Sequence, residues 1–311
     1  MDNYRSFRER LKRDIARQWR SSKEHKVLYL FLLPFFTVFF TFTIFPIVVS
    51  LVFSFTDFNA LEPPSFVGLS NYIRLFLHDS LFITAIRNTL IFSIVTGPIG
   101  FLMALLFAWL INEMNRGLRI VLTILFFAPS LVGGMGAMWG IIFSSDAAGF
   151  ANALLISLDL IGEPIRFLRD PAWIAPIVIV VVLWASLGTS FLVFIAGLQG
   201  VDRQYYEAGA IDGINNRWQE LWFITLPLMR PQLLLGAVLS ITSSFGIGDV
   251  ITQLAGFPTT DYAAHTITTH MQDFGNVRFE MGYASAIATI LFIIMIACNK
   301  GVRKLIGKVG S

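Results

Sequence analysis

The sequence predicts an all-α, polytopic membrane protein with six transmembrane helices and both termini in the cytoplasm. Hydrophobic residues make up 55% of its 311 residues and charged residues only 14%, whereas soluble domains carry about 25% charged residues. Six apolar segments are long enough to cross a bilayer, which takes about 20 residues. Lys and Arg gather on one side of these segments, as expected of charges beside a membrane surface rather than of a nucleic-acid patch.

The six expected spans carry a single charge between them, at Asp249 in the fifth. They are too long and too continuously apolar for strands or for amphipathic soluble helices. Together they define a transmembrane domain over residues 27–299. The spans are residues 27–56, 90–111, 120–145, 173–198, 231–250 and 281–299.

The distribution of Lys and Arg predicts the orientation of the spans. Eighteen of the 23 basic residues fall in residues 1–26, 112–119, 199–231 and 299–311, and five fall in the other three connections. Since cytoplasmic loops carry the excess of Lys and Arg, both ends are expected inside the cell. Residues 1–26 combine an apolar stripe with basic residues, which predicts a helix lying in the cytoplasmic interface; a flexible basic tail is the alternative. Residues 300–311 form a basic cytoplasmic tail.

The cytoplasmic connection 199–231 is long and has helical periodicity. Gly213 suits the left-handed position after a first short helix, and Asn215 or Asn216 can cap a second one. Pro227 is expected to end that second helix, and Pro231 to begin the next span. Two tryptophan side chains on the second helix would lie in water unless they pack either on the ends of the protein's own spans or on a partner.

The same connection contains Glu207-Ala208-Gly209, then Asp212-Gly213, and then Pro227-Leu228-Met229-Arg230-Pro231. In residue and spacing this resembles the EAA loop of binding-protein-dependent ABC importer permeases. Flanking segments resemble the carbohydrate branch of that family, which includes maltose-type and multiple-sugar permeases. These segments are Phe66 to Tyr72, Asn88-Thr89 and Gly197-Leu198-Gln199.

The resemblance implies a type I ABC importer permease in a bacterial or archaeal plasma membrane. In the family the EAA loop docks on a separate ATP-binding subunit, which implies an ATPase-coupling role for six residues: Glu207, Ala208, Gly209, Asp212, Gly213 and Trp218. The family usually has Ala where this chain has Gly209 and commonly Ala where it has Ile214, so the packing of the loop on the ATPase should differ in detail. The implied partners are a second, similar permease (a different chain, by analogy with the branch), two ATP-binding subunits and an extracytoplasmic solute-binding protein.

The chain itself is expected to be a transport permease and not an enzyme. It contains no GxxxxGK[ST] phosphate-binding loop, so ATP and Mg²⁺ are expected on the partner subunit and no cofactor on this chain. The single cysteine, Cys298, cannot form an internal disulfide. The five-residue gap between His265 and His270 matches no helical metal motif, so both histidines are expected at the surface and no metal site is predicted.

Polar residues inside spans are costly and therefore mark candidate substrate positions. A sugar is held by hydrogen bonds and by stacking on aromatic faces, which four residues of the fourth and fifth spans could supply: Trp184, Ser243, Ser244 and Asp249. Helix packing is the alternative role of the small polar residues. At the level of function, an ABC importer for a non-sugar solute is the first alternative. A secondary transporter is the second, although it would be expected to show an internal repeat and intramembrane charges.

Overall fold

The computed structural model describes residues 26–131 and 135–306, which are mostly helical. The chain divides into two compact units, residues 1–52 and 53–311, which are taken separately. The expected interfacial arm lies outside the described residues except for Lys26, and the last five residues of the basic tail also lie outside them.

The described part of the first unit, from residue 26 on, is a nearly unbroken helix. Helix α2 (Lys26–Phe39) continues through a π turn, η1 (Phe40–Ile44), into α3 (Phe45–Phe53). The stretch Leu30–Phe53 is long and apolar enough to cross a membrane, and none of it is buried inside the protein. A helix with Phe, Leu and Val exposed on all sides is stable only where its surroundings are apolar, so this segment fits a lipid-facing span.

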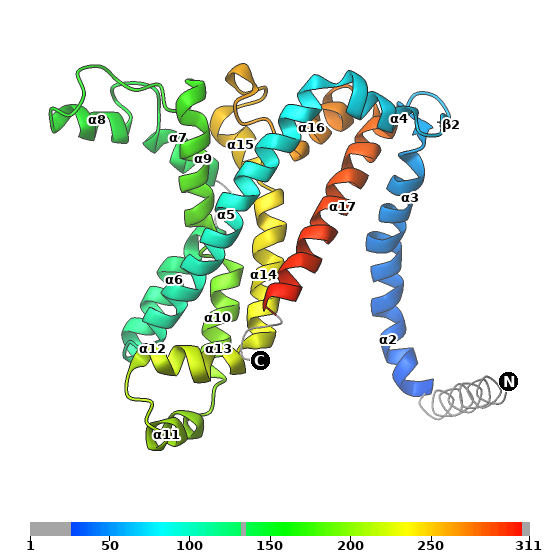
Figure 1. Cartoon of the computed structure of the whole chain (residues 1–311). Coiled ribbons are helices and arrows are strands. Elements are labelled where there is room, and N and C mark those ends of the chain that lie inside the picture. Colours follow the sequence, from blue (N-terminus) through cyan, green and yellow to red (C-terminus); the bar gives the residue numbers. More distant parts are fainter. Residues whose placement is uncertain (1–25, 132–134, 307–311) are drawn as a thin grey trace. The chain divides into compact units, whose positions relative to one another are not determined.

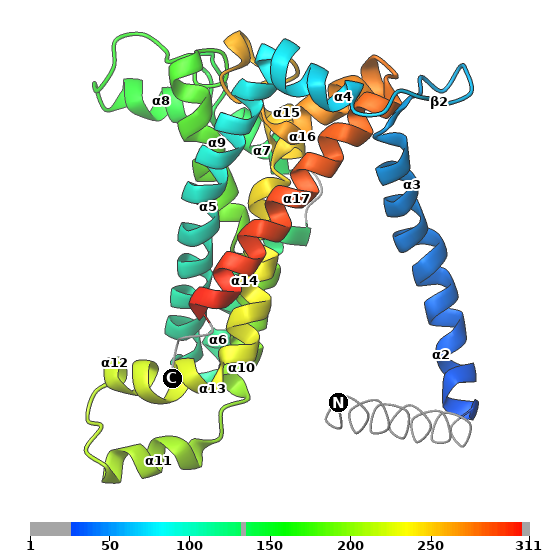
Figure 2. The ribbon, with the colours of Figure 1, turned by 45° about the vertical axis from the view of Figure 1, so that its right-hand side comes forward.

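The second unit is a helical bundle around a long central helix, α5 (Ser80–Asn112). Helices α10 (Thr189–Gln199) and α14 (Arg230–Phe245) pack against α5 and against each other, and α17 (Met281–Ile306) packs along α14. Helix α9 (Pro171–Ala185) packs on another part of α5. Phe191 and Phe194 of α10 are fully buried in the core formed with α5 and α14. The bundle is shown in Figures 1 and 2.

Shorter elements close the two ends of this bundle (Figure 1). One end, called the α11 end, carries α11 (Arg203–Ile211), α12 (Arg217–Glu220), the π turn η3 (Leu221–Thr225) and α13 (Leu226–Leu228). The opposite α16 end carries the remaining short elements. These are β1 (Thr56–Asp57) paired antiparallel with β2 (Ser65–Phe66), α4 (Ser70–Ile73), η2 (Arg74–His78), α8 (Phe150–Ser157), α15 (Gly248–Ala255), η4 (Thr260–Tyr262), α16 (Ile267–Gln272) and η5 (Asp273–Val277).

Four helices among the described residues are long and apolar enough to cross a membrane, and a fifth span results if the bent pair 217–228 and 230–245 is one span. They correspond to five of the six expected spans. The expected span 120–145 is divided between α6 (Arg116–Leu131) and α7 (Met135–Ile142), with residues 132–134 undescribed between them. Six spans with cytoplasmic termini therefore stay a prediction.

Two span boundaries differ from the expected ones for local reasons. Helix α14 ends at Phe245, before the predicted residue 250, because Gly246 forms its C-cap and a separate helix, α15, follows. The fourth span is interrupted at residues 186–188, between α9 and α10, where Gly188 has a non-helical backbone (φ −102°, ψ −119°). Each interruption falls on a glycine, the residue least able to hold a helix apart from proline.

Candidate functional site

The connection 199–231 forms two short helices joined by a tight turn. The side chain of Asp202 caps α11 by accepting a hydrogen bond from the Gln204 N–H at 3.0 Å. At the other end Gly213 has φ +90°, and the Ile214 N–H donates to the Gly209 carbonyl at 2.9 Å. This is the hydrogen-bond pattern of a Schellman motif, in which a left-handed glycine satisfies the last carbonyls of a helix.

The second helix of this connection follows the prediction at its start and departs from it at its end. Asn216 caps α12 by accepting from the Gln219 N–H at 2.9 Å. Pro227 does not end the helical segment, so that prediction was wrong: the chain stays helical to Leu228. Pro227 lies in the first turn of α13, directly after the π turn η3, where a missing N–H costs little.

Contacts within the connection hold α11 against η3. Gly209 is buried, and a Cβ added there would lie 2.6 Å from Ile224 Cδ1 of η3. The Tyr206 hydroxyl is 2.9 Å from the Thr225 hydroxyl, also in η3. Gly209 therefore permits a close approach of α11 to η3 that a larger side chain would prevent.

Helix α12 is also joined to the end of α5. Arg217 forms ion pairs with Glu113, just beyond α5, at 3.2 Å and with Glu220 at 2.9 Å. The ring of Trp218 lies 4.9 Å from that of the buried Trp109 in α5. The protein's own span thus covers one face of Trp218, yet the residue stays 65% exposed.

The remaining predicted coupling residues lie on the exposed surface of α11 and its turn. Glu207, Ala208 and Asp212 are all exposed. Glu207 pairs with Arg203 one turn earlier at 3.1 Å, with both side chains in solvent. Such an exposed i,i+4 pair contributes little to stability, so nothing among the residues that the structure describes requires a carboxylate at position 207.

A separate pocket lies at the interruption between α9 and α10. It has a volume of about 420 Å³, opens to the surface, and is lined mostly by apolar groups with several hydroxyl groups among them. Ser186, Gly188 and Thr189 come from the interruption, and Thr242 and Ser243 come from α14. Polar residues of the fourth and fifth expected spans therefore line the same open pocket.

The structure does not bring the four predicted substrate residues together. Ser243 lines the pocket, whereas Ser244 is buried, and its hydroxyl lies 3.3 Å from where a Cβ of Gly97 in α5 would be. Trp184 packs edge-on against Trp139 at 5.2 Å, and Asp249 accepts a hydrogen bond from Gln272 at 2.7 Å. Ser244 thus takes the helix-packing role that was the alternative.

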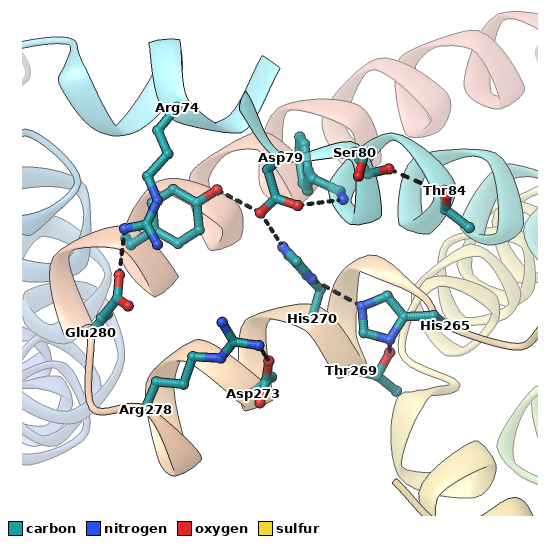
Figure 3. Close-up of polar contacts among 12 residues, drawn as sticks. Arg74, Asp79, Ser80, Thr84, His265, Thr269, His270, Asp273, Arg278 and Glu280 are labelled. Atoms are coloured by element: carbon teal, nitrogen blue, oxygen red, sulfur yellow. Dashed lines mark hydrogen bonds and ion pairs between the residues drawn. The ribbon is translucent and has the colours of Figure 1, made fainter. Parts of the chain in front are cut away.

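The expectation that His265 and His270 lie at the surface was wrong, because both side chains are only 2% exposed. His265 Nε2 is 2.9 Å from His270 Nδ1, and His270 Nε2 is 3.0 Å from an Asp79 carboxylate oxygen (Figure 3). No group of three or more potential metal ligands occurs among the residues that the structure describes. No sequence pattern predicts the contact between His270 and Asp79, because the two residues are 191 positions apart.

Taken together, a bundle of long apolar helices and an exposed helical loop define a polytopic membrane protein. The chain belongs to the binding-protein-dependent transport system inner membrane component family, which matches residues 96–308. This confirms the family inferred from the EAA-like loop and shows the chain to be a transport-system component of the inner membrane.

Individual relatives and solved structures agree with this family. The chain is 31% identical to the probable ABC transporter permease protein YesP of Bacillus subtilis, over 88% of each chain. It is 30% identical to the lactose transport system permease protein LacF of Rhizobium radiobacter, over 86% of this chain and 89% of that one. A chain in the crystal structure of a bacterial ABC transporter that imports alginate matches 93% of this chain and 99% of its own length, with 27% identity and a TM-score of 0.74.

Proposed function

We propose that this chain is one permease subunit of an ATP-driven importer that takes up a sugar or oligosaccharide delivered by a solute-binding protein. Relatives named for lactose and arabinooligosaccharide transport support the substrate class. A similar solved transporter is in complex with a periplasmic protein that carries an alginate pentasaccharide, which supports the binding-protein partner.

The observation that carries the proposal is the construction of the loop at the α11 end. Gly209 lets α11 pack closely on Ile224 of η3, and Arg217 forms an ion pair with Glu113 next to α5. The outer residues of the loop, Glu207 and Asp212, remain exposed. A loop that is rigidly attached on one side and exposed on the other suits a surface that receives force from a partner.

The partner in the proposal is a separate ATPase that binds ATP and Mg²⁺ and docks on α11. A carboxylate on an exposed helix suits a basic residue in a docking groove, where partial desolvation strengthens the contact. Movement of α11 would pass to α5 through Arg217 and Trp218, and to α14 through α13. This chain would pair with a second permease, and the two would rock between inward-open and outward-open states.

The pocket at the α9–α10 interruption is the proposed substrate contact within this chain. The Ser186 and Ser243 hydroxyls donate to backbone carbonyls and keep their oxygens as acceptors. Together with the Thr189 hydroxyl they suit the hydroxyl groups of a sugar. A broken helix at this depth is tolerated where the freed backbone groups line a cavity. Trp184 and Asp249 lie outside the pocket lining and would meet a sugar only in another state of the cycle.

The experiment that tests the proposal is purification of the tagged chain from its native membrane in mild detergent. We expect an ATPase with a phosphate-binding loop and a second polytopic permease to copurify, and Glu207→Arg to reduce recovery of the ATPase. Glu163→Arg is the matched control, since Glu163 is an equally exposed carboxylate in the segment that follows α8. Purification of the chain without an ATPase, under conditions that preserve known membrane complexes, would contradict the proposal.

A further inference from the structure

A buried chain of hydrogen bonds connects three elements at the α16 end (Figure 3). Asp79 caps α5 by accepting from the Phe82 N–H at 3.0 Å. One oxygen of the same carboxylate accepts from the Tyr283 hydroxyl of α17 at 2.7 Å and contacts His270 of α16 at 3.0 Å. His270 in turn contacts His265, whose Nδ1 lies 3.3 Å from the Thr269 hydroxyl.

The Asp79 carboxylate determines where the protons of the two imidazoles lie. Because a carboxylate only accepts hydrogen bonds, His270 must donate from Nε2, and in the neutral ring its Nδ1 is then an acceptor. His265 must therefore donate from Nε2 and accept at Nδ1. Neutral rings thus fit the chain with a single arrangement of protons. One added proton is held on His270 beside Asp79, with His265 then donating from Nδ1 to the Thr269 hydroxyl, whereas protonation of both rings places two N–H donors opposite each other and breaks the chain.

This hydrogen-bond chain lies where the segment from α15 to α16 meets the bundle. Asn88 of α5 donates to the carbonyl of His265 at 2.9 Å, and Thr89 accepts from the Ile267 N–H at 2.9 Å. Gln272, at the end of α16, holds Asp249 of α15. Helix α15 supplies Val250 to the lining of the pocket at the α9–α10 interruption. The position of α16 on the bundle is thus connected to the end of that pocket.

The charges around the two histidines are largely paired with one another. Arg278 pairs with Asp273 of η5 at 2.7 Å, and Arg74 of η2 pairs with Glu280 just before α17. Asp79 is the carboxylate in direct contact with His270. Tyr262 packs edge-on against His265 at 5.3 Å. No unpaired acidic group among the described residues contacts His265, so a positive charge there would be poorly compensated.

We infer that Asp79, His270 and His265 form an acid-sensitive latch, which holds α16 and its neighbouring segment on the bundle at neutral pH and releases them on protonation. The three residues act as positioning residues for the segment between α14 and α17. Under the proposed orientation this segment faces the outer compartment, where the pH varies most. The effect on transport rests on the proposed function, whereas release of the segment does not.

The direction of the pH dependence follows from linkage. Burial, and secondarily the neighbouring His270, lower the pKa of His265 from 6.5 to about 4. Burial also lowers the pKa of His270, against the opposing effect of Asp79. A histidine that is neutral when latched and titrates normally when released stabilises the latched state fully above about pH 6.5, and this stabilisation is lost as the pH falls toward the lower pKa.

The test is hydrogen exchange of the assembled importer in lipid nanodiscs, followed by mass spectrometry at about pH 7.5 and about pH 5, with correction for the intrinsic exchange rates. His265 alone should raise the opening equilibrium of the latch ~30-fold over this range. The rise should appear in peptides covering residues 260–275 and be absent from α10. The double variant His265→Gln/His270→Gln should lose the pH dependence. His78→Gln should keep it, because His78 is an exposed histidine in the preceding η2 turn.

Three results would overturn the inference. The first is a change of less than about threefold in the opening equilibrium of the wild type, against the ~30-fold expected from linkage. The second is an equal loss of protection from exchange in α10. The third is a pH dependence that persists in the double variant. The wild-type series needs no variant, so the inference stays testable if the double variant does not assemble. Because exchange is measured without transported substrate, its outcome is independent of whether the importer carries a sugar.

Discussion

The close approach of α11 to η3 at Gly209 predicts that a large side chain there disconnects the exposed loop from the bundle. A Cβ at this position would lie 2.6 Å from Ile224 Cδ1 and 3.2 Å from Ile214 Cδ1. In Gly209→Ala the end of the Ile224 side chain must move by roughly 1 Å to restore an ordinary contact. A rotamer strain of ~1 kcal/mol then opposes a gain of ~1 kcal/mol in helix propensity.

Gly209→Leu should behave differently from Gly209→Ala. Its three further carbons have no space between α11 and η3, and overpacking of this kind costs ~1–3 kcal/mol. Moving α11 away from η3 relieves that cost, because the opposite face of α11 is exposed. We therefore expect Gly209→Ala to resemble the wild type and Gly209→Leu to keep ATP hydrolysis while losing most solute uptake.

The assay is the ratio of solute transported to ATP hydrolysed by the importer reconstituted in liposomes. Gly301→Leu is the matched control, since it introduces the same side chain into a helix of the same chain at a position with no atom within 4 Å of an added Cβ. An unchanged ratio in Gly209→Leu would refute the reasoning, because the α11–η3 contact would then not be needed to transmit movement. A fall of the same size in Gly301→Leu would show that the effect is not specific to that contact.

Two further predictions concern single hydrogen-bonding side chains. Tyr206→Phe removes the contact with Thr225 and should lower protection of α11 from hydrogen exchange by ~1 kcal/mol, whereas Tyr205→Phe, at a side chain 54% exposed, should leave it unchanged. Equal effects of the two substitutions would contradict this. Asn152 is fully buried and donates to the carbonyls of residues 144, 146 and 165 while accepting from the Ile165 N–H. Asn152→Leu should therefore leave several backbone groups unpaired, at ~1–3 kcal/mol each, and open residues 144–165 to limited proteolysis. A variant that resists the protease as well as the wild type does would refute this prediction.

Residues that marked the family in the sequence proved to hold the loops of the α16 end. Asn71 donates to the carbonyls of Ser54 and Thr56, which fixes the start of the loop after the first helix. Asn88 and Thr89 bind the backbone of the segment before α16. A single sequence identifies such residues by likeness to a family, but their partners lie up to 178 residues away and no local pattern reveals them.

Burial of the two histidines was the clearest failure of reasoning from the sequence. Their spacing of five residues matches no helical face, and the nearby Asp261 and Asp273 favour a surface position. The structure buries them because the segment folds back onto α5 and α17, where the Asp79 carboxylate receives the hydrogen bond of His270 and that of the Tyr283 hydroxyl. That contact depends on three segments meeting in space.

The sequence by itself determined the apolar segments, the family, the helix end at Gly213 and a cap at Asn215 or Asn216, because these depend on composition and on residues close together in the chain. The tertiary structure alone decided which polar residues share a cavity, which indole is covered and which histidines are buried. Ser186 and Ser243 line one pocket because α9, α10 and α14 pack side by side around an interrupted helix. Contacts of this kind depend on how whole helices pack. A rotation of α14 would move Ser243 out of the pocket and into the position that Ser244 occupies against α5.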